Sequence, residues 1–206
     1  MKYALLHELL DRCEQYEKEG GEANMADFAL WLNSRYERPR TGMPNTSLDD
    51  EMAIGLGKLY KHARHYVKTA LANTPLKGGD DFAFLATLQE TGDLRKSELI
   101  RYNFIEFSPG MEVIRRLIRR GLIEDYDDPE DGRSKKVRVT AKGRAAFMES
   151  LSEMAKASKI ISGGLAAEEK GQFLHLARKL LHFHQPIWEN DQGTQLDEIM
   201  EKYTEA

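Results

Sequence analysis

The chain has 206 residues, a net charge of −4, a hydrophobic fraction of 41% and one cysteine, Cys13. This length is enough to bury a core, and no apolar run approaches the roughly 18 residues that a membrane helix needs. The N-terminal segment is amphipathic and mixed in charge, unlike a secretion signal. A single cysteine excludes an intramolecular disulfide framework and fits a reducing compartment. We therefore expect a soluble, cytoplasmic protein with no membrane partner.

The charge is distributed unevenly along the chain. Residues 93–144 hold 13 basic and 10 acidic side chains, a net charge of +3, whereas the remainder holds 17 and 24, a net charge of −7. An acidic remainder limits nonspecific adhesion and leaves local phosphate contacts available. The central segment is thus the part best suited to a polyanion.

Apolar residues at helical spacing predict a mainly α-helical chain. Pro39, Gly42 and Pro44 mark a linker, and Ser47 with Asp50 marks a helix start. Thr140 is a candidate N-cap. A tail from Gln185 contains Pro186 and ends in an acidic segment with a short terminal helix. The predicted helices cover residues 2–18, 23–36, 47–72, 82–91, 96–102, 108–120, 141–161 and 168–184.

The central segment has the order helix, short helix, turn, helix and two-stranded hairpin. In the third helix, Ser108 is placed to cap and Pro109 to occupy the first helical position, and Gly121 ends the helix. Four arginines crowd this helix: Arg115, Arg116, Arg119 and Arg120. The hairpin comprises strands over 122–126 and 136–140, joined by a polar turn over 127–135 with Arg133 at its tip. This order is that of a winged helix-turn-helix, in which a helix enters the DNA major groove.

At these residues the chain resembles the multiple-antibiotic-resistance regulators, the MarR family. The wing GLIEDYDDPEDGRSKKVRVTAKGR carries the resemblance, with support from VIRRLIRRGLI and LAAEEKGQFLHLARKLL. It covers about residues 48–184. It implies a mainly α fold: a winged helix-turn-helix with a two-stranded β wing and long N- and C-terminal dimerisation helices. It also implies a homodimer that binds double-stranded DNA at a palindromic operator.

The resemblance implies a domain organisation in five parts. Residues 1–45 are an N-terminal helical extension, which we interpret as additional dimer interface because its apolar faces need burial. The other parts are a dimerisation helix (46–75), the DNA-binding domain (79–142), C-terminal helices that complete the dimerisation region (143–184), and an acidic tail (185–206).

The resemblance also assigns DNA-binding roles. Ser108, Met111, Glu112 and Arg115 would face the groove, while Arg116 and Arg119 would reach phosphates. Arg133 would enter the minor groove, oriented by Asp131, which fixes the wing. Arg95, Lys135 and Lys136 would add phosphate contacts.

Three of these positions depart from the family pattern. Pro109 and Met111 replace small polar residues, and Glu112 replaces a basic or polar one. Glu112 either accepts from cytosine or pairs with Arg115 or Arg116.

Other functions have less support in the sequence. Cys13 near Tyr16 resembles the cysteine of peroxide-sensing relatives, but a small buried side chain is the alternative. His62 and His65, and the histidines of the last helix, lack a metal-ligand pattern, so we expect no metal and no cofactor. No phosphate loop, nucleophile elbow or zinc helix is present, so we expect no enzyme.

The sequence therefore predicts a transcriptional regulator. A small effector would bind between the dimerisation helices and the DNA-binding units, with Tyr60, Tyr66, Phe82 and Phe84 as aromatic candidates; core packing is their alternative role. The other function to consider is a winged-helix protein-interaction module without DNA binding.

Overall fold

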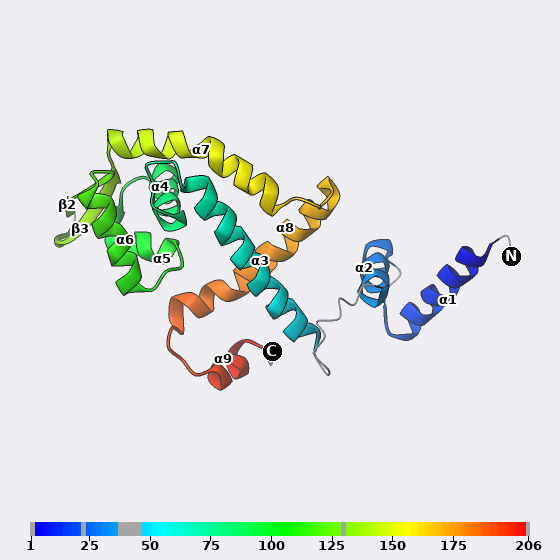
Figure 1. Ribbon diagram of the computed structural model, residues 1–206. Coiled ribbons are helices and arrows are strands. Elements are labelled where there is room, and N and C mark those ends of the chain that lie inside the picture. The colour runs from blue at the N-terminus through cyan, green and yellow to red at the C-terminus, as the bar shows by residue number, and fades with distance from the viewer. Residues whose placement is uncertain (1–2, 22–23, 37–46, 129–130, 205–206) are drawn as a thin grey trace. The chain divides into compact units, whose positions relative to one another are not determined.

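The computed structural model describes the chain except for residues 1–2, 22–23, 37–46, 129–130 and 205–206, and it leaves the side chains of residues 33–36 and 132–133 undescribed. The linker expected around Pro39, Gly42 and Pro44 lies outside the described residues. The chain forms two compact units, residues 1–56 and 57–206. Figure 1 labels their elements.

The first unit contains the helices α1, Ala4–Lys18, and α2, Met25–Tyr36, together with the start of α3, Leu48–Leu71. α1 and α2 pack through the aromatic rings of Tyr16, Phe28 and Trp31, whose centroids lie 5.4–5.9 Å apart. The start of α3 is capped as predicted: the Asp50 amide donates to Ser47 Oγ at 3.1 Å, and Ser47 donates back to the Asp50 carboxylate.

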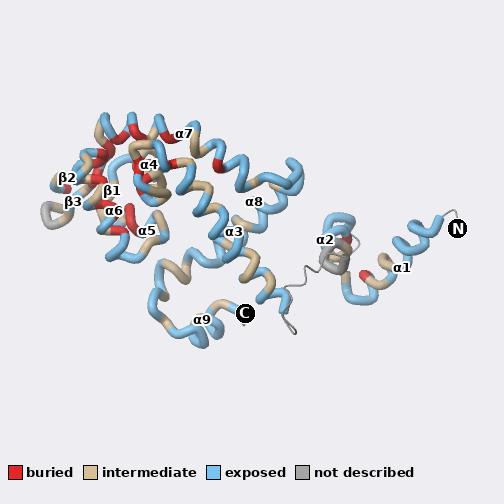
Figure 2. The backbone as a smooth tube through the Cα atoms, in the orientation of Figure 1, coloured by how far each residue is buried: buried red, intermediate tan, exposed pale blue. Residues whose placement is uncertain are grey.

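The second unit contains the rest of α3 and a winged helix-turn-helix. The elements after α3 are α4 Gly79–Thr91, β1 Leu94–Arg95, α5 Lys96–Tyr102, α6 Phe107–Arg119, β2 Ile123–Asp128, β3 Asp131–Val139, α7 Ala141–Ile161, α8 Ala167–Asn190 and α9 Leu196–Tyr203. The buried residues gather where α4, α5, α6 and the strands meet, whereas the residues of α8 are intermediate or exposed and none is buried (Figure 2). Phe84, Leu99, Ile114, Leu117 and Val137 are fully buried in this core.

The wing is a three-stranded antiparallel sheet in the order β1-β3-β2. Leu94 pairs with Val137, and Ile123 pairs with Val139. The two strands of the hairpin were predicted, whereas β1 was not, because two residues are too few to show a periodicity.

The wing strands also extend further than predicted. The expected polar turn over 127–135 is wrong, since β2 runs to Asp128, β3 begins at Asp131, and Asp127 pairs with Lys135. Opposite charges facing each other across two strands stabilise such pairing. Arg133 therefore lies within β3 and not at the tip of the wing.

The start of α6 differs from the prediction as well. The N-cap residue is Glu106 and the helix begins at Phe107, so Ser108 does not cap it and Pro109 is its third residue. Proline is tolerated there because the first four amides of a helix have no partner within the helix. The end at Gly121 is as predicted: with φ +66°, its amide donates to Ile118, and that of Leu122 donates to Leu117.

The last long helix continues past its expected end at His184. α8 includes Pro186 and ends at Asn190. The Pro186 carbonyl accepts from Asn190 Nδ2 at 2.9 Å, and the ring of Trp188 lies 6.0 Å from that of Phe104. Packing against the residues before α6 thus outweighs the tendency of proline to end a helix. The predicted terminal helix is present as α9.

Candidate DNA-binding surface

One face of α6 is free of the core. Ser108, Glu112, Arg115 and Arg119 are exposed and lie at successive helical turns, whereas Val113, Ile114 and Leu117 are buried on the other side. We call these four residues the α6 stripe. Met111 is half-buried and packs against the core, so it lies beside the stripe and not on it.

Close packing against α5 holds the N-terminal half of α6. Gly110 is buried, and a Cβ added to it would lie only 2.7 Å from Ile100 Cγ1 and Cγ2. Glycine at this position therefore allows the two helices of the helix-turn-helix to approach closely.

Within the α6 stripe, Glu112 pairs with Arg115. Arg115 Nη1 lies 2.5 Å from Glu112 Oε1, and both side chains are about 60% exposed. In the free protein, Glu112 therefore pairs with Arg115 and not with Arg116. An exposed pair of this kind contributes at most about 1 kcal/mol, so Arg115 can exchange Glu112 for DNA.

The other two arginines of α6 that form ion pairs, Arg116 and Arg120, point toward the core. Arg116 donates through Nε and Nη2 to Asp81 Oδ1 at 2.9 and 2.6 Å, and Arg120 donates through Nη1 to Asp81 Oδ2 at 3.1 Å. Arg120 also donates to the Pro75 carbonyl. Asp81 has no exposed surface. Arg119 differs: within the described part of the chain it has no carboxylate partner.

A second buried carboxylate, Asp128, joins the wing to the start of α5. It accepts from Arg95 Nε at 2.9 Å and from Ser134 Oγ at 3.2 Å, and Lys136 Nζ lies 3.3 Å away. The pKa of Arg95 is raised because of the hydrogen bond to Asp128. The side chains of Arg95 and Lys136, both expected at phosphates, are thus engaged with this carboxylate in the free protein.

A second ion pair links the same two parts. Lys96 Nζ lies 2.6 Å from Asp125 Oδ2, and this hydrogen bond lowers the pKa of Asp125. Lys96 follows Arg95 directly, so adjacent residues at the start of α5 both hold the wing.

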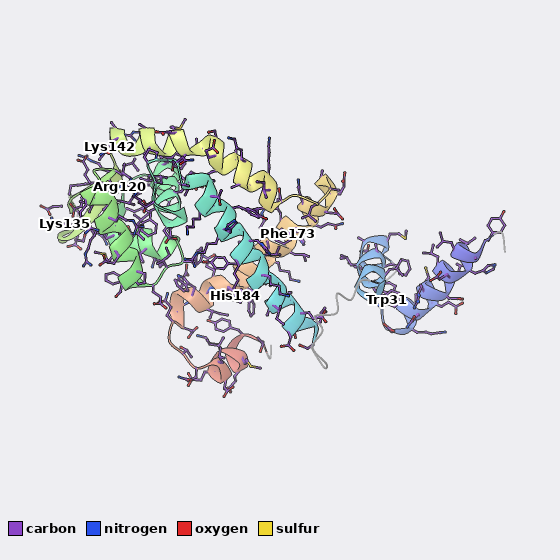
Figure 3. The ribbon with its side chains drawn as sticks, viewed as in Figure 1. Trp31, Arg120, Lys135, Lys142, Phe173 and His184 are labelled. Carbon is purple, nitrogen blue, oxygen red and sulfur yellow. The ribbon has the colours of Figure 1, made fainter. Side chains whose placement is uncertain are left out.

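Towards its tip the wing is more open. Lys135 is exposed, with Nζ 3.6 Å from Asp127 Oδ1 (Figure 3). The carbonyl of Asp131 accepts from Ser134 Oγ. The side chain of Arg133 is among those that the structure leaves undescribed.

Sequence reasoning missed Asp81 and Asp128. A bulge between Asp127 and Asp128 breaks the alternation along β2, so the inward position of Asp128 has no signal in the sequence. Asp81 lies in the first turn of α4, where an acid is usually exposed and favoured by the helix dipole.

The four aromatic effector candidates are dispersed. Phe84 is fully buried in the core, Phe82 stacks on Phe147 at 4.9 Å, and Tyr66 lies against His62 and His65. Tyr60 is exposed and lines a hollow of about 790 Å³, which we call the α3–α4 cleft. The cleft is lined by Tyr60, Ala63, Arg64, Val67, Lys68, Lys77, Gly78, Gly79, Asp80, Phe104, Ile105 and Arg116.

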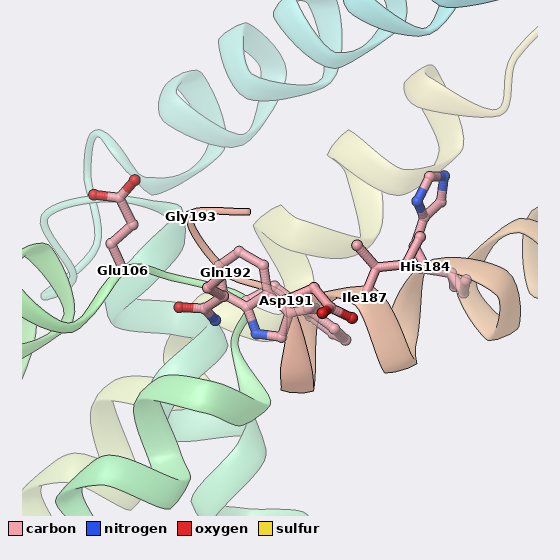
Figure 4. A pocket seen from close by; sticks show the side chains of 9 residues that line it. Glu106, His184, Ile187, Asp191, Gln192 and Gly193 are labelled. Carbon is pink, nitrogen blue, oxygen red and sulfur yellow. The ribbon is translucent and has the colours of Figure 1, made fainter. Parts of the chain in front are cut away.

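A smaller hollow of about 350 Å³ lies between the C-terminal end of α8 and the residues before α6 (Figure 4). His184 and Ile187 line it from α8, and Glu106, the N-cap of α6, lines it from the other side. Among the described residues, no group of three His, Cys, Asp or Glu side chains is placed to hold a metal ion. The described helices include none that is long and apolar enough to cross a membrane.

Comparison with known proteins agrees with this geometry. Residues 76–143 match the family of winged helix DNA-binding domains. No curated protein sequence matches the chain significantly. Residues 76–143 therefore form a domain of the winged helix DNA-binding class.

Similar solved structures identify the fold of the chain more closely. A probable transcriptional regulator from Pseudomonas aeruginosa is 27% identical over 65% of this chain and 99% of its own, with a TM-score of 0.59. A MarR mutant from E. coli complexed with operator DNA is 17% identical over 66% and 99%, with a TM-score of 0.60. PcaV from Streptomyces coelicolor, in complex with its natural ligand, is 24% identical over 68% and 98%, with a TM-score of 0.60. The resemblance to MarR regulators is confirmed at the level of the fold: the chain has the fold of these regulators and contains a winged helix DNA-binding domain.

Proposed function

We propose that the protein acts as a homodimer on a palindromic operator, which it reads with the α6 stripe. The observation that carries this proposal is the exposed line of Ser108, Glu112, Arg115 and Arg119 on a helix whose other side is fixed in the core. A helix of this size enters a major groove, and arginine recognises guanine edges there. Two such helices would lie about 34 Å apart along the DNA, one turn of the duplex.

The wing supplies the second contact in this proposal. Arg133 would enter the minor groove, whose narrow segments attract a guanidinium, and the exposed Lys135 would contact a phosphate. Arg95 and Lys136 support the wing through Asp128 and would contribute to phosphate binding only by exchanging that partner.

Dimerisation is supported by the exposure of α8. In α8, all of which the structure describes, none of the 24 residues is buried. Two pairs of apolar side chains on α8 are spaced seven residues apart, so the members of each pair share a face. The pairs are Leu174 with Leu181 and Leu176 with Phe183, and all four side chains are more than a third exposed. A second copy would bury these side chains.

The N-terminal helices add to the same proposal. On α1, Leu5, Leu6, Leu9 and Leu10 are between 41% and 78% exposed, while the inner face is covered by α2. A second copy of this hairpin would cover them.

The α3–α4 cleft is the proposed effector site. Arg64, Lys68 and Lys77 line it, against one acid, Asp80, so it suits a small anion with an apolar body. The cleft also includes Arg116 of α6, so a ligand there would touch the helix that reads DNA. PcaV, which has this fold, binds its natural ligand in the solved complex.

The proposal is tested by selecting genomic fragments that bind the protein and titrating the selected fragment at several salt concentrations. We expect a palindromic fragment, a steep salt dependence, and weaker binding by Arg119→Ala and by Arg133→Ala. Arg119→Ala should reduce the salt slope by about 1, the loss of one phosphate contact. Lys202→Ala, which removes an exposed positive charge on α9, is the control and should leave the slope unchanged.

Absence of any enriched fragment would contradict DNA binding and favour the winged-helix protein-interaction module. The charge of the α6 stripe argues against that alternative, because docking surfaces for proteins are usually depleted of charge at their centre.

A further inference from the structure

We propose that Asp81 is a positioning residue: it sets the orientation of α6 through Arg116 and Arg120, and neither arginine contacts DNA. This inference rests on the proposed function, in which α6 reads the operator. Of the four arginines on α6, Arg116 and Arg120 would hold the helix in place, and Arg115 and Arg119 would contact the DNA.

The geometry of the carboxylate supports this division. Oδ1 of Asp81 accepts two hydrogen bonds from Arg116, and Oδ2 accepts one from Arg120 and one from the Lys77 amide at 3.0 Å. All four donors point at one buried group, which connects α6 with the first turn of α4 and with the loop that follows α3.

The burial of Asp81 makes both arginines poor DNA ligands. Its side chain is 0% exposed, whereas those of Arg116 and Arg120 are 33% and 27% exposed. If either arginine moved to a phosphate, a buried carboxylate would lose a charged partner, and such losses are among the most costly in proteins. Arg115 and Arg119 have no such constraint: among the residues that the structure describes, Arg115 pairs with the exposed Glu112 and Arg119 has no carboxylate partner.

The contacts of Arg116 and Arg120 with Asp81 would affect DNA binding because they control how α6 is rotated about its axis. Arg116 and Arg120 are one helical turn apart, so together they fix the rotation of the helix about its axis. Arg115 and Arg119 each precede one of them directly. A rotation of α6 would therefore turn the α6 stripe away from the groove while leaving the stripe residues unchanged.

The test compares Asp81→Asn, Arg116→Gln, the double variant and Arg119→Gln in the full-length chain. Affinity for the selected operator is measured at several salt concentrations, and thermal unfolding shows that each variant is folded. We expect Asp81→Asn and Arg116→Gln each to weaken operator binding on the order of tenfold. The double variant should bind no more weakly than the weaker single variant, because both changes remove the same contact.

The salt slope separates positioning from phosphate contact. Arg116→Gln should leave the slope unchanged, whereas Arg119→Gln should lower it by about 1. A slope lowered equally by both variants, with additive losses in the double variant, would overturn the proposal. Failure of the unaltered protein to bind any fragment specifically would instead reject the proposed function.

A lysine variant keeps the test decisive if Asp81→Asn does not fold. Lysine retains the charge that a phosphate contact needs, but it cannot make the two-atom contact of Arg116 with Asp81 Oδ1. Arg116→Lys should therefore bind the operator as weakly as Arg116→Gln. Recovery of affinity by Arg116→Lys, with a salt slope about 1 greater than that of Arg116→Gln, would show that Arg116 contacts phosphate.

Discussion

The buried carboxylate of Asp128 accepts a hydrogen bond from Arg95 Nε at 2.9 Å, and this contact fastens the wing to the N-cap of α5. The two residues are 33 positions apart, and Arg95 also belongs to β1, the short strand that pairs with β3. The wing is thus held to the helix-turn-helix by side chains as well as by strand pairing.

Replacement of Asp128 should destabilise the protein, because Arg95, Lys136 and Ser134 all lose the same acceptor. We expect Asp128→Asn to lower the free energy of unfolding by about 1–3 kcal/mol, measured by urea denaturation. Asp127→Asn is the matched control: its carboxylate is 78% exposed, so the change should stay within about 0.5 kcal/mol. Equal effects of the two substitutions would contradict the assignment.

Gly143 should not tolerate a side chain. It lies in the first turn of α7, where its amide donates to Thr140 Oγ1 at 3.0 Å and a Cβ would collide with the Leu122 carbonyl. We expect Gly143→Ala to cost about 1–3 kcal/mol of unfolding free energy. In Gly171→Ala the new methyl meets nothing within 4 Å on the exposed surface of α8, so this control should stabilise by up to about 1 kcal/mol. A neutral Gly143→Ala would argue against this close approach.

Acid should weaken the wing through Asp125. The hydrogen bond from Lys96 holds the pKa of Asp125 below its usual value in the folded protein, so folding favours the ionised carboxylate. The stability from this contact is present above about pH 4 and is lost as the pH falls through the lower folded pKa. We expect Asp125→Asn to flatten the decline in unfolding free energy between about pH 5 and pH 3. An equally steep decline in Asp125→Asn and the unaltered protein would refute this prediction.

A charge on the apolar face of α8 should prevent dimerisation. Leu176 is 51% exposed in the single chain and would be buried by a second copy. We expect Leu176→Asp to shift the mass measured by analytical ultracentrifugation from dimer to monomer, because an unpaired buried carboxylate is costly. His182→Asp, on the polar side of α8, should remain dimeric. A dimer that persists in Leu176→Asp would place the interface elsewhere.

The fold was largely predictable from the sequence, and the details of the candidate site were less so. Helical periodicity placed the long helices, and the wing pattern identified the class, because both depend on local spacing of apolar residues. α5 has the predicted bounds, and Thr140 caps α7 as predicted. The errors concern Pro109, Pro186 and the extent of the wing strands, where helix ends and pairing depend on neighbours distant in sequence.

The sequence by itself determined that this chain presents an arginine-rich helix followed by a wing, because amphipathic periodicity and turn residues are local properties. It did not determine which arginines are held by buried carboxylates inside the protein. That was decided by the tertiary structure, which buries Asp81 beneath Arg116 and Arg120 and Asp128 beneath Arg95. A carboxylate removed from water attracts the nearest guanidinium regardless of its distance along the chain, and only the folded arrangement of α4, α6 and the wing shows which one is nearest.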